Sequence, residues 1–205
     1  MNRDLGVCRP GDSDLMVLEG DARCAAPYLL ATMDCRCYNS LVSDAHLSND
    51  EDDARFMRLA LEQAAHAASL GEVPIGAVAV HRGQVVGAGY NRKEYDQDPT
   101  AHAEMDAIRQ AARALQNWRL LGVTLYCTVE PCPMCAGAMI QARLERLVYG
   151  APDVRFGAAG TIVDVLGESR FNHRVAVQAG VLADEAAALL QQFFRQLRVD
   201  NNDDT

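Results

Sequence analysis

The spacing of hydrophobic and polar residues divides this chain near residue 50. Residues 1–50 mix glycine, proline, aspartate and serine with scattered apolar residues. They show no sustained period of about 2 or 3.6 residues, which is typical of an irregular or disordered segment. Residues 51–198 carry regular patterns, and residues 199–205 form an acidic end. We therefore expect an N-terminal extension, one folded domain and a short C-terminal tail.

The regular part of the chain predicts alternating helices and strands. Acidic residues at 50–53 begin a helix whose apolar positions recur at helical spacing as far as Gly71. The β-type runs 74–81 and 84–90 flank Arg82-Gly83 and predict a hairpin. Further helices are expected over 102–115, 134–142 and 183–198, and further strands over 123–128, 146–150 and 175–177, while 161–166 is of uncertain type. This order predicts an α/β fold, a three-layer α/β/α sandwich around a mixed sheet of about five strands.

Two short motifs lie at the predicted starts of two helices. His102-Ala103-Glu104 opens the helix over 102–115, and Pro131-Cys132-Pro133-Met134-Cys135 leads into the helix over 134–142. One imidazole nitrogen and two thiolates suit zinc, and helix N-termini favour thiolate over thiol. His102, Cys132 and Cys135 are therefore the predicted ligands of one Zn²⁺ ion per chain.

The number of ligands in this set has a chemical consequence. Three protein ligands leave the fourth tetrahedral position open, as in catalytic zinc sites. Zinc lowers the pKa of a bound water to about 7, and a nearby carboxylate can carry the proton that is released. We therefore predict a hydrolytic zinc enzyme with Glu104 as the catalytic proton carrier. A structural zinc site would need a fourth ligand, for which His173 and Cys127 are the candidates.

Composition and charge leave a nucleic-acid partner open. The chain is 49% hydrophobic and 23% charged, and it has no apolar run near the ~20 residues of a membrane span. The net charge is −9, but residues 1–50 carry −4, residues 199–205 carry −3, and residues 51–198 only −2. Because binding depends on where cations cluster, the nearly neutral domain could still meet phosphates.

The start of the chain and its cysteines indicate a compartment. Residues 1–20 contain acidic residues and no apolar block, so they do not match a secretory signal. The seven cysteines are an odd number, which without an export signal favours thiols and metal ligands over disulfides. We expect a cytoplasmic protein with no membrane segment.

The two motifs together carry a resemblance to a known family. H-x-E followed by P-C-x-x-C is the zinc deaminase signature, and from about residue 52 to 198 the chain resembles bacterial tRNA-specific adenosine deaminases. This family belongs to the cytidine deaminase superfamily. Several segments carry the likeness: Glu72 to Ala77, Asn91-Arg92, Asp98 to Glu104, Glu130 to Cys132, Met134 to Met139, Gly157 to Gly160 and Asn172 to Arg174.

The resemblance implies a reaction and a set of binding residues. It implies hydrolytic deamination of adenosine to inosine at the wobble position of a tRNA anticodon, usually an arginine tRNA, with the base flipped into the pocket and ammonia released. It also implies a cytidine deaminase-like fold and a homodimer, whose interface we expect at residues 134–143. The implied substrate-binding residues are Asn91 on the purine edge, Ile75 on the ring, Ala103 beside the base, Asp153 near a neighbouring ribose and Phe194 beside the anticodon.

Two other functions stay open at this point. A small-molecule nucleobase deaminase, acting on guanine or cytosine, would account for the acidic net charge and for Pro133, which recurs in enzymes of that kind. A catalytically silent, zinc-containing RNA-binding subunit is the other possibility. Glu104 argues against silence, because loss of this glutamate is its expected mark.

Overall fold

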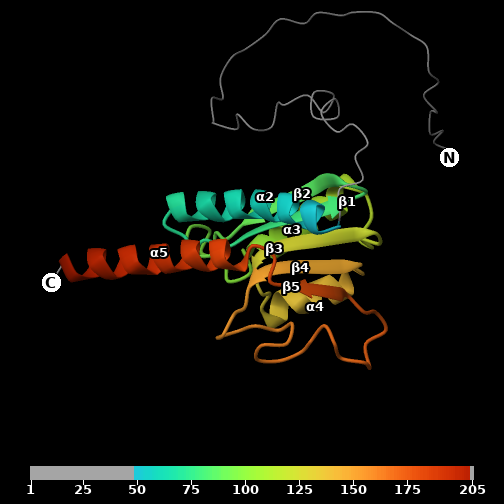
Figure 1. Ribbon diagram of the computed structural model, residues 1–205. Helices are drawn as coiled ribbons and strands as arrows, with labels where there is room; N and C mark the ends of the chain where they lie inside the picture. Colours follow the sequence, from blue (N-terminus) through green and yellow to red (C-terminus); the bar gives the residue numbers. More distant parts are fainter. Residues whose placement is uncertain (1–48, 204–205) are drawn as a thin grey trace, which may run out of the picture. The chain divides into compact units, whose positions relative to one another are not determined.

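The computed structural model describes residues 49–203, and Figure 1 shows their arrangement. The irregular extension expected at residues 1–50 lies outside the described residues, except that Asn49 and Asp50 already belong to the first described helix. Every helix within residues 49–203 is too short or too polar to span a bilayer.

A mixed five-stranded sheet forms the middle of the domain, in the order β2-β1-β3-β4-β5. Its strands are β1 Gly76–His81, β2 Gln84–Tyr90, β3 Val123–Val129, β4 Arg146–Ala151 and β5 Ala176–Ala179. β1 is antiparallel to both β2 and β3, whereas β3, β4 and β5 are parallel. β2, β3 and β4 therefore run in the same direction and end at the same side of the sheet, which we call its carboxyl end.

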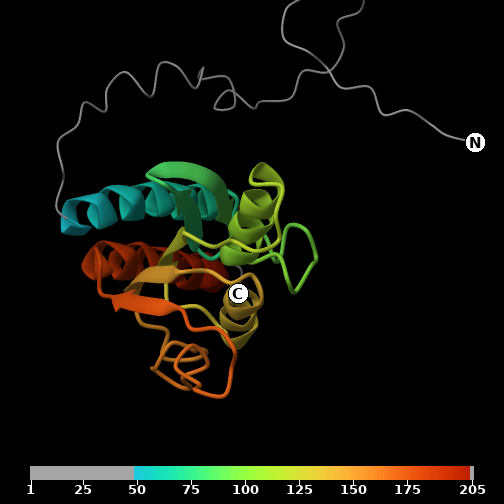
Figure 2. The same cartoon turned by 90° about the vertical axis from the view of Figure 1, so that its right-hand side faces the viewer.

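Helices cover both faces of the sheet. α2 (Asn49–Ser69) and α5 (Ala183–Asp203) lie on one face, and α3 (Ala103–Ala114) and α4 (Pro133–Gln141) lie on the other (Figure 2). A separate buried cluster fills the space on each side of the sheet, as two apolar faces require. The predicted three-layer sandwich with a five-stranded mixed sheet is confirmed.

A buried polar cluster fastens α2 to the sheet. Asp53 of α2 is only 3% exposed. Its two carboxylate oxygens accept hydrogen bonds from Arg146 of β4 at 2.8 and 2.6 Å, and the Tyr126 hydroxyl of β3 donates to Oδ1 at 2.9 Å. Because these donors come from two different strands, the cluster fixes α2 across the parallel pair.

Small residues in β2 set the distance between α3 and the sheet. A Cβ atom at Gly89 would collide with the carbonyl oxygen of Ala103, and one at Gly87 would collide with that of Ala107. Glycine therefore allows α3 to lie directly against β2, with the first turn of the helix next to the last residues of the strand.

The observed elements differ from prediction toward the end of the chain. α5 continues to Asp203 and includes most of the segment expected as a tail, because neither glycine nor proline follows Arg198. It projects past the sheet in Figure 1. The uncertain segment 161–166 contains no strand, only the bridge between Ala159 and Asp164. β5 is exposed at every residue, so its sequence lacks a strong strand pattern.

Candidate metal centre and active site

The three predicted ligands lie where α3 and α4 begin. His102 is the N-cap of α3 and Cys132 the N-cap of α4, both with extended backbones, and Cys135 is in the first turn of α4. The carbonyl groups of the two N-cap residues accept the first helical hydrogen bonds, from Asp106 at 3.1 Å and Ala136 at 2.9 Å. Because their backbones are extended, these two N-cap residues lie just before the first turn of each helix. His102 thus precedes the helix that it was expected to begin.

The ligand atoms form a nearly equilateral triangle. Sγ of Cys132 lies 3.7 Å from Nδ1 of His102 and 3.7 Å from Sγ of Cys135, and the third side, Cys135 Sγ to His102 Nδ1, is 3.6 Å. Tetrahedral zinc, with Zn–S of about 2.3 Å and Zn–N of about 2.0 Å, places two sulfurs about 3.8 Å apart and sulfur and nitrogen about 3.6 Å apart. The triad therefore fits a zinc ion without rearrangement.

The group has no fourth member among the residues that the structure describes. Only His102, Cys132 and Cys135 come together as possible ligands there. Cys127 is fully buried in the apolar core, and Nε2 of His173 donates a hydrogen bond to the Leu144 carbonyl oxygen at 2.6 Å. Neither candidate for a closed structural site thus joins the group, and the geometry is that of an open site.

The triad is electrostatically prepared for a cation. The hydrogen bonds that join Cys132 to Cys135 and to His102 lower the pKa of the Cys132 thiol to about 4. The contact with Cys132 raises the pKa of His102, and the hydrogen bond to Cys132 together with burial raises that of Cys135. One thiolate is therefore present at neutral pH, and a metal ion would displace the remaining protons.

Glu104 lies in the first turn of α3, two residues after His102, and is 4% exposed. Burial raises the pKa of its carboxyl group. The carboxyl group also lies beside the triad, because His102, Cys132 and Cys135 all act on it electrostatically. Glu104 therefore has the burial and the position that a proton carrier beside a metal at this site requires.

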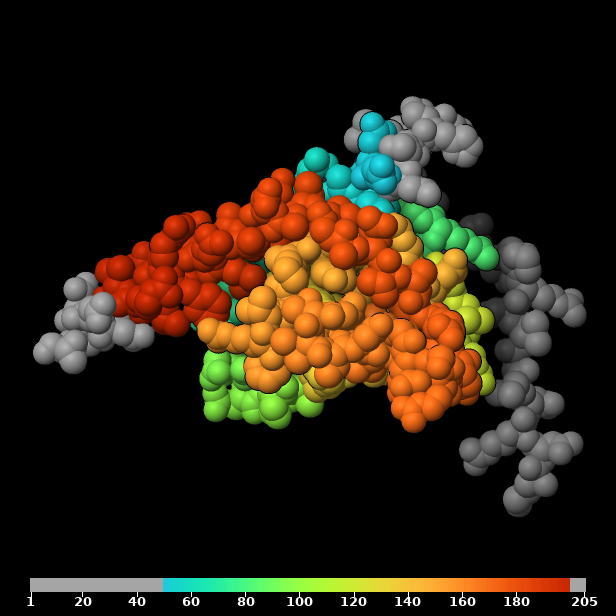
Figure 3. Space-filling view, turned by 60° about the horizontal axis from the view of Figure 1, so that its bottom comes forward, coloured from blue at the N-terminus to red at the C-terminus, as the bar shows by residue number. Residues whose placement is uncertain are grey.

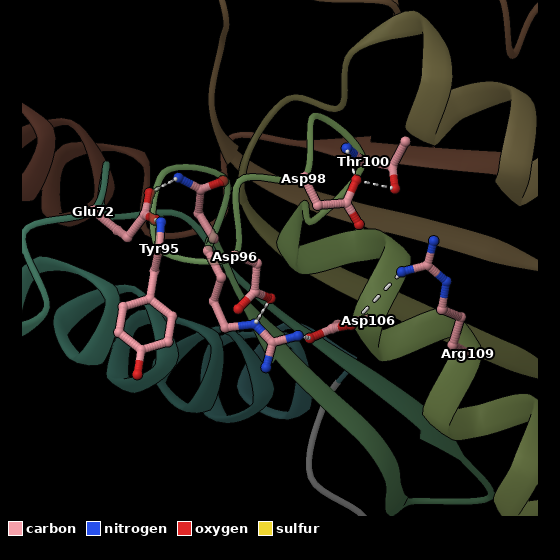
Figure 4. A network of polar contacts seen from close by, with 9 residues as sticks. Glu72, Tyr95, Asp96, Asp98, Thr100, Asp106 and Arg109 are labelled. Atoms are coloured by element: carbon pink, nitrogen blue, oxygen red, sulfur yellow. Dashed lines mark hydrogen bonds and ion pairs between the residues drawn. The ribbon is translucent and has the colours of Figure 1, made fainter.

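Asn91 directly follows β2 at the carboxyl end of the sheet and is 6% exposed. Its backbone N–H donates to the carbonyl oxygen of Ile75 at 2.9 Å, so these two predicted substrate residues are neighbours. Its side-chain Nδ2 donates to Oε2 of Glu72 at 2.9 Å, while Oε1 of Glu72 accepts from the Tyr95 N–H at 2.7 Å (Figure 4). Since both oxygens of Glu72 accept hydrogen bonds, the Asn91 amide presents its nitrogen to Glu72.

Polar contacts hold the loop between Asn91 and His102 in place, as Figure 4 shows. Arg92 forms ion pairs with Asp96 at 3.1 Å and with Asp106 of α3 at 2.8 Å. Asp98 accepts hydrogen bonds from the backbone and the hydroxyl of Thr100, both at 2.7 Å. Because this loop ends at His102 of the triad, its contacts also fix the entry into α3.

Glu130 organises the segment after β4. It is 2% exposed and accepts hydrogen bonds from the backbone N–H groups of Asp153 at 3.1 Å, Ala159 at 2.9 Å and Thr161 at 3.1 Å, and from the Thr161 hydroxyl. Burial alone would raise the pKa of this carboxyl, but the bonds from Thr161, Ala159 and Asp153 lower it. The N–H of Ala158 also donates to the Pro131 carbonyl at 2.9 Å, so the segment is fastened beside Cys132.

Asp153, predicted near the ribose, accepts hydrogen bonds through Oδ1 from the backbone N–H groups of Arg155 at 2.8 Å and Phe156 at 3.2 Å. Ala103 is fully buried, and as the first residue of α3 it has a backbone N–H without an intrahelical partner. Phe194 is half-buried on α5, with its ring 5.4 Å from that of Phe193. No described contact joins Phe194 to the triad, although the face shown in Figure 3 exposes both α5 (red) and residues 151–175 (orange).

Hydrolytic removal of an amino group from a base is the chemistry that an open three-ligand metal site beside a buried glutamate supports. The family model that matches this chain, over residues 51–198, is that of the MafB19-like deaminases. The chain belongs to this family of deaminases, and its curated relatives place it with the tRNA-specific adenosine deaminases.

Individual relatives support this placement. The tRNA-specific adenosine deaminase of Bacillus subtilis (strain 168) is 48% identical over 146 residues, which cover 71% of this chain and 91% of that protein. A solved structure from studies of A-to-I editing by tRNA:A34 deaminases is 44% identical, with a TM-score of 0.64 over 66% of this chain and 99% of the other. A structure solved with 2,6-diaminopurine is 31% identical, with a TM-score of 0.58 over 69% and 80%.

Sequence reasoning did not find the roles of Glu72 and Glu130. Both occur only within segments that carried the family resemblance, and neither matches a ligand or catalytic pattern. One signal was available: each acid stands between apolar residues, in Gly71-Glu72-Val73 and Val129-Glu130-Pro131, next to a strand end. A charged residue in such surroundings has to be paired, because an unpaired buried charge is costly.

Proposed function

We propose that this chain hydrolyses adenosine to inosine at the wobble position of a tRNA anticodon, with release of ammonia. The observation that carries the proposal is the open His102–Cys132–Cys135 triangle with Glu104 buried next to it. The group of deaminases to which the chain belongs supports RNA as the substrate, and an arginine tRNA is the proposed one.

The protein's contribution to the chemistry centres on Glu104. A zinc ion held by His102, Cys132 and Cys135 would supply Lewis acidity that makes water a nucleophile near neutral pH. Glu104 accepts a proton from the water that attacks C6 of adenine and delivers it to N1 of the ring. It then passes the second proton to the departing amino group, so that one water is consumed and one ammonia leaves. Burial of Glu104 supports both transfers, because burial raises the pKa of the carboxyl and so makes it a stronger proton acceptor than an exposed glutamate.

Residues at the carboxyl end of the sheet would hold the base. The amide of Asn91 keeps its oxygen and one N–H for the purine edge after bonding to Glu72. Ile75, whose carbonyl bonds to Asn91, supplies an apolar contact to the ring, and the free N–H of Ala103 supplies a donor. Asp153 would face the ribose of a neighbouring nucleotide, and Phe194 on the projecting α5 would flank the anticodon.

We further propose a homodimer formed through the outer surface of α3 and α4. A shallow, mainly apolar groove lies between these helices, where Trp118 is 56% exposed. The groove is lined by Ile108, Arg109, Ala112, Trp118, Ala138, Gln141 and Ala142. An exposed apolar surface with a tryptophan at its rim is typical of protein–protein interfaces.

The direct test is an assay on an arginine tRNA anticodon stem-loop. We expect the protein to convert the wobble adenosine to inosine, measured by nucleoside analysis of the digested RNA, and to leave an otherwise identical stem-loop with guanosine at that position unchanged. Conversion of free guanine or cytosine without conversion of the RNA would contradict the proposal. That result would instead support the nucleobase deaminase that Pro133 suggests.

A further inference from the structure

Tyr95 is an exposed aromatic residue on a rigidly held loop. It is 72% exposed, among the most exposed large apolar side chains that the structure describes. Its backbone, in contrast, is fixed, because its N–H donates to the buried Glu72 carboxylate at 2.7 Å. Figure 4 shows its ring directed away from that carboxylate. The protein thus holds the ring ready on its surface, with little conformational freedom to lose on binding.

The location of Tyr95 connects it to the active site. Its loop starts at Asn91, after β2, and ends at His102 of the metal triad. The other oxygen of Glu72 accepts the hydrogen bond from the Asn91 amide, so one carboxylate positions both the base-binding amide and the exposed aromatic residue. Tyr95 therefore lies on the loop that borders the site, where its exposed ring is available to a nucleotide next to the one bound at Asn91.

The surroundings of Tyr95 favour contact with the face of a base over contact with a phosphate or an apolar protein surface, because the residues on either side of it, Glu94 and Asp96, are acidic. Arg92 is engaged by Asp96 and Asp106, whereas Lys93 is exposed and takes part in no described ion pair. The residues next to Tyr95 in sequence are charged or polar, and an isolated aromatic residue does not form the contiguous apolar patch typical of protein interfaces. An exposed aromatic ring next to an active site is the kind of group on which unpaired bases stack, and stacking on the ring face does not depend on the charge of the loop.

We propose that Tyr95 stacks on an unpaired base next to the target adenosine in the RNA. This inference rests on the proposed function, since it needs an RNA substrate whose neighbouring nucleotides are splayed. Stacking uses the face of the ring and does not require the hydroxyl group. The role therefore belongs to binding of the RNA and contributes nothing to the chemical step at C6.

Three variants test the proposal with the anticodon stem-loop as substrate. We expect Tyr95→Ala to raise KM roughly 5- to 100-fold, the range of base–aromatic stacking, with little change in kcat. Tyr95→Phe should keep KM near its original value, because the ring remains. Phe171→Ala is the matched control and should leave KM unchanged. Phe171 is also an exposed aromatic residue, at 46%, but it lies next to Asn172, which accepts a hydrogen bond from Arg143 after the C-terminal end of α4. An unchanged KM in Tyr95→Ala would overturn the proposal.

A spectroscopic measurement locates the stacked base. Stem-loops carrying 2-aminopurine at one or the other neighbour of the target adenosine should lose fluorescence at one position when they bind the unsubstituted protein or the Tyr95→Phe variant. Binding to Tyr95→Ala should leave that fluorescence unquenched, and equal quenching by all three proteins would also overturn the stacking role. If the unsubstituted enzyme forms no inosine, the proposed function fails and the stacking role fails with it. If the unsubstituted enzyme forms inosine and the Tyr95→Ala variant has an unchanged KM, the stacking role fails while the proposed function stands.

Discussion

The side-chain amide of Asn91 donates a 2.9 Å hydrogen bond to the carboxylate of Glu72, and both residues are almost completely buried. This contact decides which way the amide faces, because both oxygens of Glu72 accept hydrogen bonds from N–H groups. An amide whose orientation is fixed can distinguish donors from acceptors on the edge of a bound base. If Asn91 binds the purine edge as proposed, Glu72 would be a positioning residue for base recognition that carries no reacting atom.

Replacing Glu72 by glutamine should impair base recognition more than it impairs folding. Glutamine can both donate and accept, so the Asn91 amide would no longer have a single favoured orientation. We expect kcat/KM on the stem-loop to fall about 10- to 100-fold, the equivalent of one charged hydrogen bond of roughly 1.5–3 kcal/mol. Steady-state kinetics with a thermal melt check this prediction. Glu62→Gln, at an exposed position of α2, is the control and should change neither quantity.

Glu104 and Cys132 should fail in different ways when replaced. Glu104→Gln keeps the metal ligands intact but cannot carry a proton, so we expect about one zinc per chain, unchanged RNA binding, and turnover reduced by roughly 10²- to 10⁴-fold or more. Cys132→Ser removes a ligand and should lose both the metal and stability, because metal binding is coupled to folding. Elemental analysis together with the inosine assay separates the two. Zinc-free Glu104→Gln protein, or substantial residual turnover in it, would contradict the assignment.

Glu130→Gln should loosen the segment after β4. The glutamine amide would bring a donor among the N–H groups of Asp153, Ala159 and Thr161, and an unsatisfied buried donor costs about 1–3 kcal/mol. We expect faster amide hydrogen exchange over residues 153–161, with exchange in α3 unchanged, and a higher KM for the stem-loop. Thr161→Val, which removes only the hydroxyl bond, should show the same effect to a smaller degree.

Two neighbouring aspartates should differ sharply in their effect on stability. Asp53→Ala leaves Arg146 and Tyr126 without their buried partner, and we expect a loss of roughly 3 kcal/mol or more in the free energy of unfolding. Asp52 forms a 3.3 Å ion pair with Arg55 at the surface, so Asp52→Ala should cost less than about 1 kcal/mol. Urea denaturation measures both. Similar losses in the two variants would show that the buried cluster contributes no more than the surface pair.

A charge placed in the groove between α3 and α4 should prevent dimer formation. Ala138 lines this groove, and Ala138→Glu would leave a carboxylate without a partner in the proposed interface. Sedimentation velocity should then show a monomer, while the unsubstituted protein sediments as a dimer. Val85→Glu, at an exposed residue at the start of β2, should remain dimeric. A dimeric Ala138→Glu protein would exclude this surface as the interface.

Local patterns were sufficient to predict most of the fold. Helical spacing of apolar residues located α2 and α3, and the Arg82-Gly83 turn located the hairpin, because these features depend on neighbours in sequence. The ligand triad was equally visible, since each ligand type is chemically specific and His102 and Cys132 mark helix starts.

Features that depend on distant contacts could not be predicted in this way. β5 is exposed at every position and is a strand only because β4 offers it a parallel partner. The roles of Glu72 and Glu130 depend on donors that lie 19 to 31 positions further along the chain. The residues near Glu72 or Glu130 in the sequence do not indicate which distant groups bond to them. The functions predicted for Asp153 and Phe194 likewise depend on the bound RNA.

The placement of β3 between β1 and β4 has a consequence for how the enzyme matures. His102 precedes β3 in the sequence and the two cysteines follow it, so the native triad brings together segments that lie on either side of the central strand. The order His102, β3, Cys132, Cys135 means that a metal bound to all three side chains would close a loop containing β3. Metal binding would therefore stabilise the insertion of the central strand, because the ligand set is complete in the folded sheet.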